Sequence, residues 1–336
     1  MSGRFVAFGE IMLRLSPPGR ELLLQTPKLD VWIAGAEANV AGALAQLGHD
    51  VRLVSALPEN PLGDTAFRTL RGLGVDVSGI RRAAGRMGLY FVETGAGLRP
   101  TEVHYDRAHS AFAETPAEAW DWDALLDGAD RLHLSGITPA LGPNGTRAAL
   151  TAADAATRLG VPISFDGNYR SRLWEAWDGK PAETLDRLVR QADILFGNHR
   201  DVALLLGQPF SAEGSERRRE AALAAFNAYP GLRFIASTAR RVESSDHHRI
   251  SARIDTPDEA FETEELPVTG IVDRIGTGDA FAAGVLHAFR KGMGIADMAR
   301  MGQMLNLLKH SMPGDVLMID DARLGSLAAE GQDAKR

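Results

Sequence analysis

The feature that most constrains this chain is a repeated alternation of short apolar segments with longer alanine- and leucine-rich segments. The short segments predict strands at 5–8, 51–55, 131–135, 161–165, 194–196 and 234–236. The longer segments predict helices at 38–47, 64–73, 145–158, 182–191 and 217–229. This alternation predicts an α/β fold with a doubly wound, mostly parallel sheet and helices on both faces. The carboxyl ends of the strands would share one edge, where such sheets bind ligands.

Two stretches, residues 11–33 and 86–112, interrupt this pattern with alternating apolar residues and turn residues. Within the second stretch, residues 89–94 and 102–105 flank a loop that contains glycine and proline, which predicts a β-hairpin. We expect a small inserted β lid, and the alternative is a pair of long decorated loops. No linker separates two domains, so residues 1–325 are predicted to form one domain, followed by a tail at 326–336.

Composition narrows the functional classes. The 336 residues carry a net charge of −7, which argues against a general nucleic-acid or membrane-surface binder because those partners require a basic face. The absence of cysteine removes disulfides, thiolate metal sites and cysteine nucleophiles. The apolar run near the amino terminus is too short for a signal-peptide core, and no later run reaches membrane-spanning length. A cytoplasmic protein is expected.

The sharpest local motif is Gly276-Thr-Gly-Asp279, which directly precedes a strong helical pattern. Glycines let a turn direct several N–H groups at one point, and a helix start adds its own free N–H groups, so Gly276, Thr277 and Gly278 can hold a phosphoryl group. Asp279 could then accept a proton from an attacking hydroxyl. The alternative is that Asp279 only caps the helix. The motif is neither a Walker A loop nor a dinucleotide-binding turn.

A second motif, Gly35-Ala-Glu-Ala-Asn39 within a longer alanine-rich segment, lies in the amino-terminal half. With both motifs in this order, the chain resembles the ribokinase-like (PfkB) family of carbohydrate kinases. The segments Ser135-Gly-Ile-Thr138, Asp166-Gly-Asn-Tyr-Arg170 and Lys309-His-Ser-Met-Pro-Gly-Asp315 resemble those of its 2-dehydro-3-deoxygluconate (KDG) kinase members. The family fold has a β lid, in agreement with the pattern above.

The resemblance implies roles around the sugar. Residues implied to bind substrate are Gly35, Ala36, Asn39, Tyr90, Tyr105, Arg107, Ile137 and Arg170. A keto acid needs a cation, and the planar fork of arginine matches a carboxylate. Arg170 would sit near the substrate carboxylate or the transferring phosphate. Either arginine could instead be a surface residue, and Asn39 could be a simple helix cap.

The resemblance also implies roles for the nucleotide and metal ions. The implied nucleotide contacts are Asn168, Arg170, Asn198, Ser237, Thr238, Arg240, Gly276 and Gly278. Asn198 and Asp201 would organise Mg²⁺, largely through water, unless they form an exposed helix start. Asp273 could bind a monovalent cation such as K⁺, which is left open. Relatives have glycines after the late strand that are missing here, and we interpret His247 and His248 as part of a solvated loop.

Together these features predict an ATP- and Mg²⁺-dependent kinase with Asp279 as catalytic base. The implied acceptor is a hydroxyl of a keto-deoxy sugar acid, foremost 2-dehydro-3-deoxygluconate, which would become its 6-phosphate. The alternatives are a neutral sugar such as fructose or ribose, a nucleoside, or a non-catalytic sugar-binding protein. A homo-oligomer that pairs through the β lid is also expected, because exposed strand edges seek partners.

Overall fold

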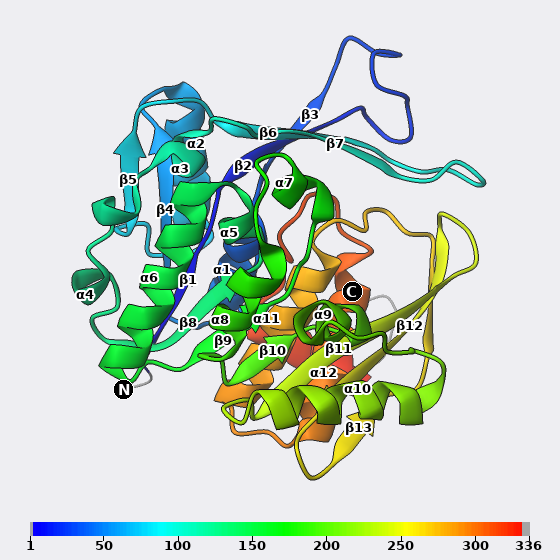
Figure 1. Cartoon of the computed structure of the whole chain (residues 1–336). Coiled ribbons are helices and arrows are strands. Elements are labelled where there is room, and N and C mark those ends of the chain that lie inside the picture. Colours follow the sequence, from blue (N-terminus) through cyan, green and yellow to red (C-terminus); the bar gives the residue numbers. More distant parts are fainter. Residues whose placement is uncertain (1–2, 331–336) are drawn as a thin grey trace.

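The computed structural model describes residues 3–330, without the side chains of 327–330. Within these residues, a large sheet of ten strands forms the centre of the molecule (Figure 1). In spatial order its strands are β13 (Ala260–Glu262), β12 (His247–Asp255), β11 (Phe234–Val242), β10 (Ile194–Phe196), β9 (Ile163–Asp166), β8 (Ala129–Ser135), β1 (Arg4–Phe8), β4 (Val51–Pro58) and β5 (Ile80–Ala83). Strand β14 (Leu266–Thr269) pairs with β12 outside this path.

The sheet is parallel from β11 to β5 and antiparallel only at the β12 edge, so the predicted fold class is confirmed. The side-chain alternation of strand β1 shows how the sequence builds two cores. Phe5 and Ala7 point into one buried cluster, whereas Val6 and Phe8 point into the other. Because every second residue faces the same side, a strand that is apolar throughout must be covered on both faces.

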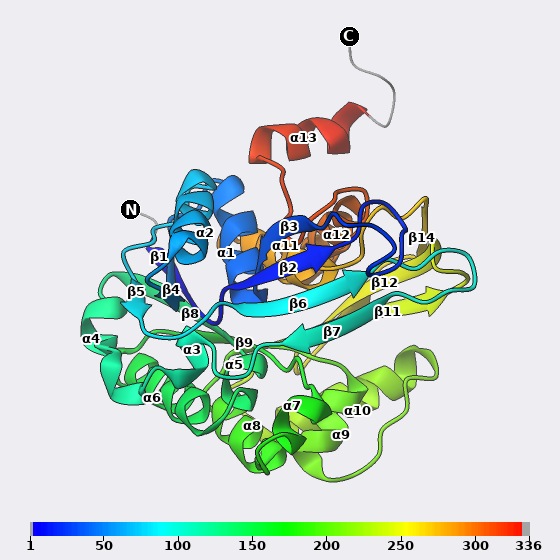
Figure 2. The same cartoon turned by 90° about the horizontal axis from the view of Figure 1, so that it is seen from above.

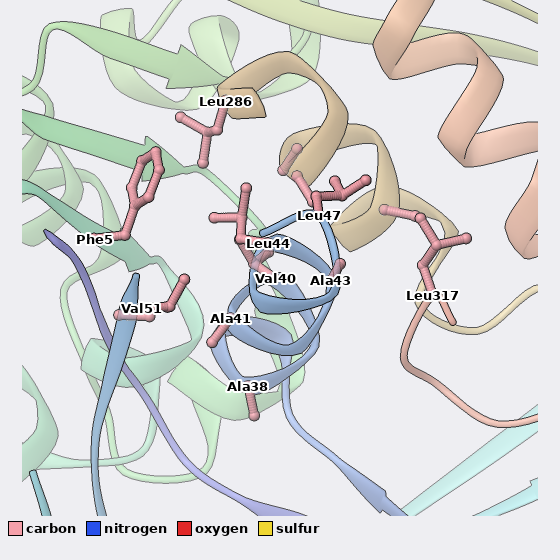
Figure 3. Close-up of a cluster of buried hydrophobic side chains, with 14 of the residues drawn as sticks. Phe5, Ala38, Val40, Ala41, Ala43, Leu44, Leu47, Val51, Leu286 and Leu317 are labelled. Atoms are coloured by element: carbon pink, nitrogen blue, oxygen red, sulfur yellow. The ribbon is translucent and has the colours of Figure 1, made fainter. Parts of the chain in front are cut away.

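Helices cover both faces of the sheet. One face carries α1 (Ala36–Gln46), α2 (Pro61–Gly72), α11 (Thr277–Arg290) and α12 (Ile295–Lys309). The other face carries α6 (Pro143–Leu159), α8 (Pro181–Val189), α9 (His199–Leu206) and α10 (Gly214–Ala228). Figure 3 shows Val40 and Leu44 of α1 among the buried side chains of the first face, together with Phe5, Val51 and Leu286.

Shorter helices connect these elements. They are α3 (Ala111–Glu114), η1 (Ala117–Ala119), α4 (Trp122–Leu125), α5 (Ile137–Ala140) and α7 (Ser171–Glu175), and α13 (Asp321–Glu330) follows the last part of the fold. Helix α13 therefore occupies the first residues of the segment expected to be a tail, and residues 331–336 lie outside the described part of the chain. Among the described residues, no helix has the length and apolar character needed to cross a membrane.

A second, small sheet is not hydrogen-bonded to the large one, and Figure 2 shows its strands β2, β6 and β7 running side by side. Its strands are β3 (Asp30–Ala34), β2 (Met12–Ser16), β6 (Gly88–Glu93) and β7 (Glu102–Asp106), in that spatial order. Strands β6 and β7 form the predicted antiparallel hairpin, with Tyr90 opposite Tyr105. We call these four strands the small sheet; they come from the two stretches that interrupt the strand–helix pattern.

The segment after Ala236 differs from its prediction. Strand β11 continues to Val242 and pairs with β12 in an antiparallel hairpin, so a strand replaces the expected loop. His247 is exposed at the start of β12, but His248 is only 1% exposed. The interpretation of both histidines as a solvated loop is therefore wrong for His248, which lies under the hairpin against His310.

Candidate active site

A cavity of about 750 Å³ lies between the small sheet and the carboxyl ends of strands β9, β10 and β11. It brings together residues that are far apart in the sequence. Those predicted from sequence that line it are Gly35, Ala36, Asn39, Tyr90, Tyr105, Arg107, Ile137, Asn168, Arg170, Asn198, Asp201, Ser237, Thr238, Arg240, Gly276, Thr277, Gly278 and Asp279. Asp273 is the predicted site residue that does not line the cavity.

The turn before α11 has a backbone that its glycine makes possible. Gly276 is the N-cap of α11 with φ 77°, in the left-handed region that favours glycine. A Cβ atom on Gly276 would lie 2.0 Å from the backbone oxygen of Asp315, so no other residue fits there without movement. Gly278 has no such neighbour and leaves open space beside the turn. The amino terminus of α11 therefore faces the cavity with free N–H groups.

Asp279 is not the cap of this helix, because α11 has no side-chain capping hydrogen bond. Its Oδ2 instead accepts a hydrogen bond of 2.7 Å from Nδ2 of Asn39. Asn39 in turn is buried inside α1, whose N-cap is Gly35, so Asn39 is not a cap either. The two sequence motifs, 240 residues apart, thus meet at one hydrogen bond that orients the Asp279 carboxylate.

The surroundings of Asp279 suit a general base at neutral pH. Burial raises the pKa of its carboxyl to about 7, with further contributions from the charges of Asp315 and Glu37. The hydrogen bond from Asn39 and the charge of Arg170 act in the opposite direction. A carboxylate whose pKa lies near the operating pH is the most effective proton acceptor, because it is ionised yet still basic.

Two further carboxylates face the same cavity. Burial raises the pKa of Asp166, at the end of β9, to about 8, and the charges of Asp279 and Asp201 add to this effect. Burial also raises the pKa of Asp201. Asp201 accepts a hydrogen bond of 2.8 Å from the backbone N–H of Asn198, and the two residues form a capping box at the start of α9. Sequence reasoning did not single out Asp166, although its place after a buried strand was a usable signal.

Arg170 is a cation that influences all three of these carboxylates. Its charge lowers the pKa values of Asp166, Asp201 and Asp279. It is exposed, and the one hydrogen bond found for its side chain goes from Nη1 to the backbone oxygen of Tyr169 at 3.0 Å. Among the described residues it makes no ion pair, so its guanidinium remains available to an anion in the cavity.

Arg107 follows strand β7 on the small-sheet side of the cavity and is buried. Its Nε donates a hydrogen bond of 2.8 Å to Oε2 of Glu10, and Nη2 donates to the same oxygen. Its guanidinium also lies 5.6 Å from the ring centroid of Tyr105, which stacks on Tyr90. Within residues 3–330 no hydrogen bond involves Nη1 of Arg107, which leaves that nitrogen for a ligand. Glu10 is a site residue that sequence reasoning missed, because its partner is 97 residues away.

Tyr90 and Asp273 belong to a buried cluster behind the turn. The hydroxyl of Tyr90 donates to Oδ2 of Asp315, and Oδ1 of Asp315 lies 3.0 Å from Nη1 of Arg14. The same nitrogen lies 2.6 Å from Oδ2 of Asp273. Asp273 therefore contacts Arg14 instead of the cavity, whereas Tyr90 and Asp315, which its hydroxyl contacts, both line the cavity.

The remaining predicted residues lie on the hairpin side of the cavity. Ser237, Thr238 and Arg240 follow one another along β11 and are half-buried or exposed. No side-chain hydrogen bond is found for any of them within the described chain. They also border a second cavity of about 550 Å³ that extends along α9 and β12, so the two cavities adjoin on this side of the site.

The carboxylates of Asp166 and Asp201 on the cavity wall are of a kind that could hold Mg²⁺. Within residues 3–330 no group of three or more histidine, aspartate or glutamate side chains is arranged to hold a metal ion. In nucleotide sites, however, Mg²⁺ keeps several water ligands and needs only one or two carboxylates in addition to the phosphates. Asp166 and Asp201 have carboxylate oxygens of that kind on the cavity wall.

Three known proteins are similar to this chain over nearly its full length. A 2-dehydro-3-deoxygalactonokinase from Haloferax volcanii is 32% identical over 321 residues, which cover 95% of this chain and 94% of that protein. A 2-dehydro-3-deoxygluconokinase from Bacillus subtilis is 28% identical over 313 residues, which cover 93% of this chain and 90% of that protein. The crystal structure of 2-dehydro-3-deoxygluconokinase from Thermotoga maritima superimposes with a TM-score of 0.92 at 37% identity, covering 97% and 99% of the two chains.

The sequence also matches the model of the pfkB family carbohydrate kinases over residues 3–308. The match spans both motifs, the small sheet and every residue that lines the cavity except Asp315. It confirms the resemblance drawn from Gly35–Asn39 and Gly276–Asp279. The chain therefore belongs to the pfkB family of carbohydrate kinases.

Proposed function

We propose that this kinase transfers the γ-phosphoryl group of ATP to a hydroxyl of a six-carbon keto-deoxy sugar acid, with 2-dehydro-3-deoxygluconate as acceptor and its 6-phosphate as product. The observation that carries the proposal is the position of Asp279. A carboxylate with a pKa of about 7, oriented by Asn39, stands at a helix start that suits an anion. Proton acceptor and phosphoryl site thus lie side by side.

The mechanism follows from this arrangement. The acceptor hydroxyl donates its proton to Asp279 as its oxygen attacks the phosphoryl group. The N–H groups of residues 276–279 stabilise the negative charge on the phosphoryl oxygens in the transition state. Arg170 contributes a positive charge to the same oxygens, and bound Mg²⁺ would neutralise the nucleotide phosphates. Asp166 and Asp201 would hold that ion through its water ligands.

Arg107 supports an acidic acceptor. Arg107 lines the cavity on the small-sheet side, and its Nη1, which has no hydrogen-bond partner within residues 3–330, can donate to a sugar carboxylate. Glu10 holds the guanidinium in place by two hydrogen bonds, which fixes the direction of the remaining donor. The similar proteins named for keto-deoxy acids derived from gluconate and galactonate support the same acceptor class.

We further propose that two copies of the chain associate through the small sheet. Its outer strands, β3 and β7, are sheet edges, and the apolar side chains of Leu24, Val31 and Leu98 near them are exposed. Burying such edges against a second copy would satisfy backbone groups and remove apolar surface from water. Because ATP is a nucleotide of the cytoplasm, we place the reaction there.

A coupled assay for ADP release tests the proposed reaction. The acceptors would be 2-dehydro-3-deoxygluconate, its galactonate-derived epimer, fructose, ribose and adenosine. We expect the highest kcat/KM with a keto-deoxy acid. If only a neutral sugar or adenosine is phosphorylated, the acceptor is not a keto-deoxy acid and the proposal is wrong. If none of these compounds causes ADP release although at least one binds, the protein binds sugars without catalysis.

A further inference from the structure

Four charged side chains are buried together behind the turn that precedes α11. Arg14 is 3% exposed, Asp273 7%, Lys309 0% and Asp315 2%. They come from four parts of the chain: strand β2 of the small sheet, the residues before the turn, the end of α12 and the segment after α12. Two cations and two carboxylates are thus almost fully buried near one another, and of the four only Asp315 also lines the cavity.

Arg14 joins the two carboxylates. Its Nη1 lies 2.6 Å from Oδ2 of Asp273 and 3.0 Å from Oδ1 of Asp315. Its Nε donates a hydrogen bond of 2.8 Å to the hydroxyl of Ser16 on the same strand. A buried carboxylate is costly unless a cation and hydrogen bonds compensate its charge, and Arg14 supplies both to each of these carboxylates.

Lys309 is the second cation. Its Nζ donates a hydrogen bond of 2.9 Å to the backbone oxygen of Met312. Burial lowers the pKa of Lys309, whereas the charges of Asp273 and Asp315 favour its protonated form. A buried ammonium that donates to the backbone oxygen of Met312 and lies within the electrostatic influence of two carboxylates supplies a positive charge that a small monovalent cation would otherwise supply.

The segment that carries Lys309 and Asp315 also holds the turn. Nδ2 of Asn306 donates 2.9 Å to the backbone oxygen of Thr277, and the N–H of Asp273 donates 3.2 Å to the oxygen of His310. The backbone oxygen of Asp315 occupies the space that a Cβ on Gly276 would need. Movement of this segment would therefore move the N–H groups that face the phosphoryl site.

The residues present do not fit an added cation at Asp273, where the family resemblance raised one. Oδ1 of Asp273 accepts a hydrogen bond of 3.0 Å from the N–H of Ile275. Oδ2 accepts from Arg14 and, at 3.1 Å, from the N–H of Gly314. Both oxygens are thus occupied by protein donors, and the charges of the cluster already balance.

We propose that Arg14 and Lys309 are built-in cations that position the phosphoryl-binding turn, so that the enzyme needs no external monovalent cation. Both are positioning residues, because neither lines the cavity. The part of this inference that concerns turnover rests on the proposed function. The part that concerns the cluster does not, since cation binding can be followed through the thermal unfolding midpoint.

The first arm of the test uses the wild-type protein. K⁺ is replaced at constant ionic strength by tetramethylammonium, which is too large for the cluster. We expect kcat to change by less than about twofold and the unfolding midpoint to stay the same. A wild-type protein that loses most of its activity without K⁺, or that K⁺ stabilises against heat, would overturn the proposal.

The second arm uses Lys309→Met, which keeps the length of the side chain and removes its charge. We expect kcat to fall about 10- to 100-fold with KM nearly unchanged, because the turn loses its position. K⁺ or ammonium should restore part of kcat and raise the unfolding midpoint, whereas tetramethylammonium should not. The matched control is Lys180→Met, an exposed lysine outside the cavity, which should show neither effect.

Full activity of Lys309→Met without any response to K⁺ would contradict the assignment. If this variant does not fold, the wild-type arm decides alone. If no acceptor is phosphorylated, the proposed function fails, but the unfolding midpoints in K⁺ and tetramethylammonium still support or overturn the built-in cations.

Discussion

The two ends of the cavity hold their functional side chains in different ways. At the acceptor end, Asn39 and Arg107 are buried, and each is fixed by hydrogen bonds to a carboxylate, Asp279 and Glu10 respectively. At the hairpin end, Ser237, Thr238 and Arg240 are half-buried or exposed, and no hydrogen bond holds them within the described chain.

This difference shows which side chains are held in place by the protein before a ligand binds. Buried polar groups must be paired, so their geometry is set by packing before any ligand binds. Exposed hydroxyl groups and arginines keep their rotamer freedom and become ordered only when a ligand binds. We therefore expect substitutions at the turn to affect turnover strongly, those at the acceptor end to affect catalysis or acceptor binding, and those on the hairpin to have modest effects.

The largest expected effect is that of Asp279→Asn, which preserves shape and removes the proton acceptor. kcat should fall about 10²- to 10⁴-fold, the usual contribution of a general base, while the KM for ATP changes little. The matched control is Asp297→Asn, an exposed aspartate in the first turn of the neighbouring helix α12. A variant at Asp279 that keeps near wild-type kcat would remove the base from the mechanism.

Arg170→Gln should have the second largest effect. The loss of a charged donor to the phosphoryl oxygens should lower kcat about 10- to 100-fold, because hydrogen bonds to charged groups are worth about 1.5–3 kcal/mol. Arg172→Gln serves as the control, because Arg172 is also exposed and lies in α7, the short helix whose N-cap is Arg170. An increase in KM for the acceptor with unchanged kcat would instead place Arg170 on the sugar acid.

Arg107→Lys tests the acceptor carboxylate without leaving Glu10 unpaired in a buried site. Lysine keeps the charge but loses the planar fork, so KM for a keto-deoxy acid should rise about tenfold with little change in kcat. Steady-state kinetics over a range of acceptor concentrations measure this. An unchanged KM would show that the carboxylate of the acceptor lies elsewhere.

The smallest effects are expected on the hairpin. Ser237→Ala and Thr238→Val should each raise the KM for ATP about two- to fivefold, since a single neutral hydrogen bond contributes about 0.5–1.5 kcal/mol. Nucleotide titrations at a saturating acceptor concentration measure this change. If either substitution raises the KM for ATP by more than the factor by which Arg107→Lys raises the KM for the acceptor, the contrast between the two ends of the cavity is reversed.

The sequence predicted much of the fold because the periodicity is local. Each expected strand and helix exists, with boundaries that differ by a few residues at most positions. Strand β11 is the main exception. Its second half, residues 237–242, is polar and charged and resembles a loop, but backbone pairing with β12 makes it a strand. A hairpin held by backbone hydrogen bonds needs no apolar pattern.

The candidate site was predicted less evenly. Residues within the two motifs line the cavity as expected, since a motif carries its own local geometry. Glu10 gave no such signal, and Asp315 lay in a segment that resembles the family but had no predicted role, because each acts through partners far away in the sequence. Arg14 and Asp315 are 301 residues apart, and only the folded chain shows that they form an ion pair. Asp273, for which a monovalent cation was left open, also contacts Arg14, which lies 259 residues away in the sequence.

In the proposed mechanism Asp279, oriented by Asn39, accepts the proton of the acceptor hydroxyl. The most direct measurement is kcat as a function of pH for the wild type and for Asn39→Ala, at saturating substrates. Burial raises the pKa of Asp279 to about 7, and a base works only when ionised, so wild-type kcat should rise with pH and level off above about 7.

Because the Asn39 hydrogen bond lowers the pKa of Asp279, the Asn39→Ala profile should shift to higher pH and its plateau should be lower. This outcome would tie the proton acceptor to the contact between the two motifs. A wild-type kcat that is constant across about pH 6 to 8, or two profiles with the same midpoint, would contradict the account.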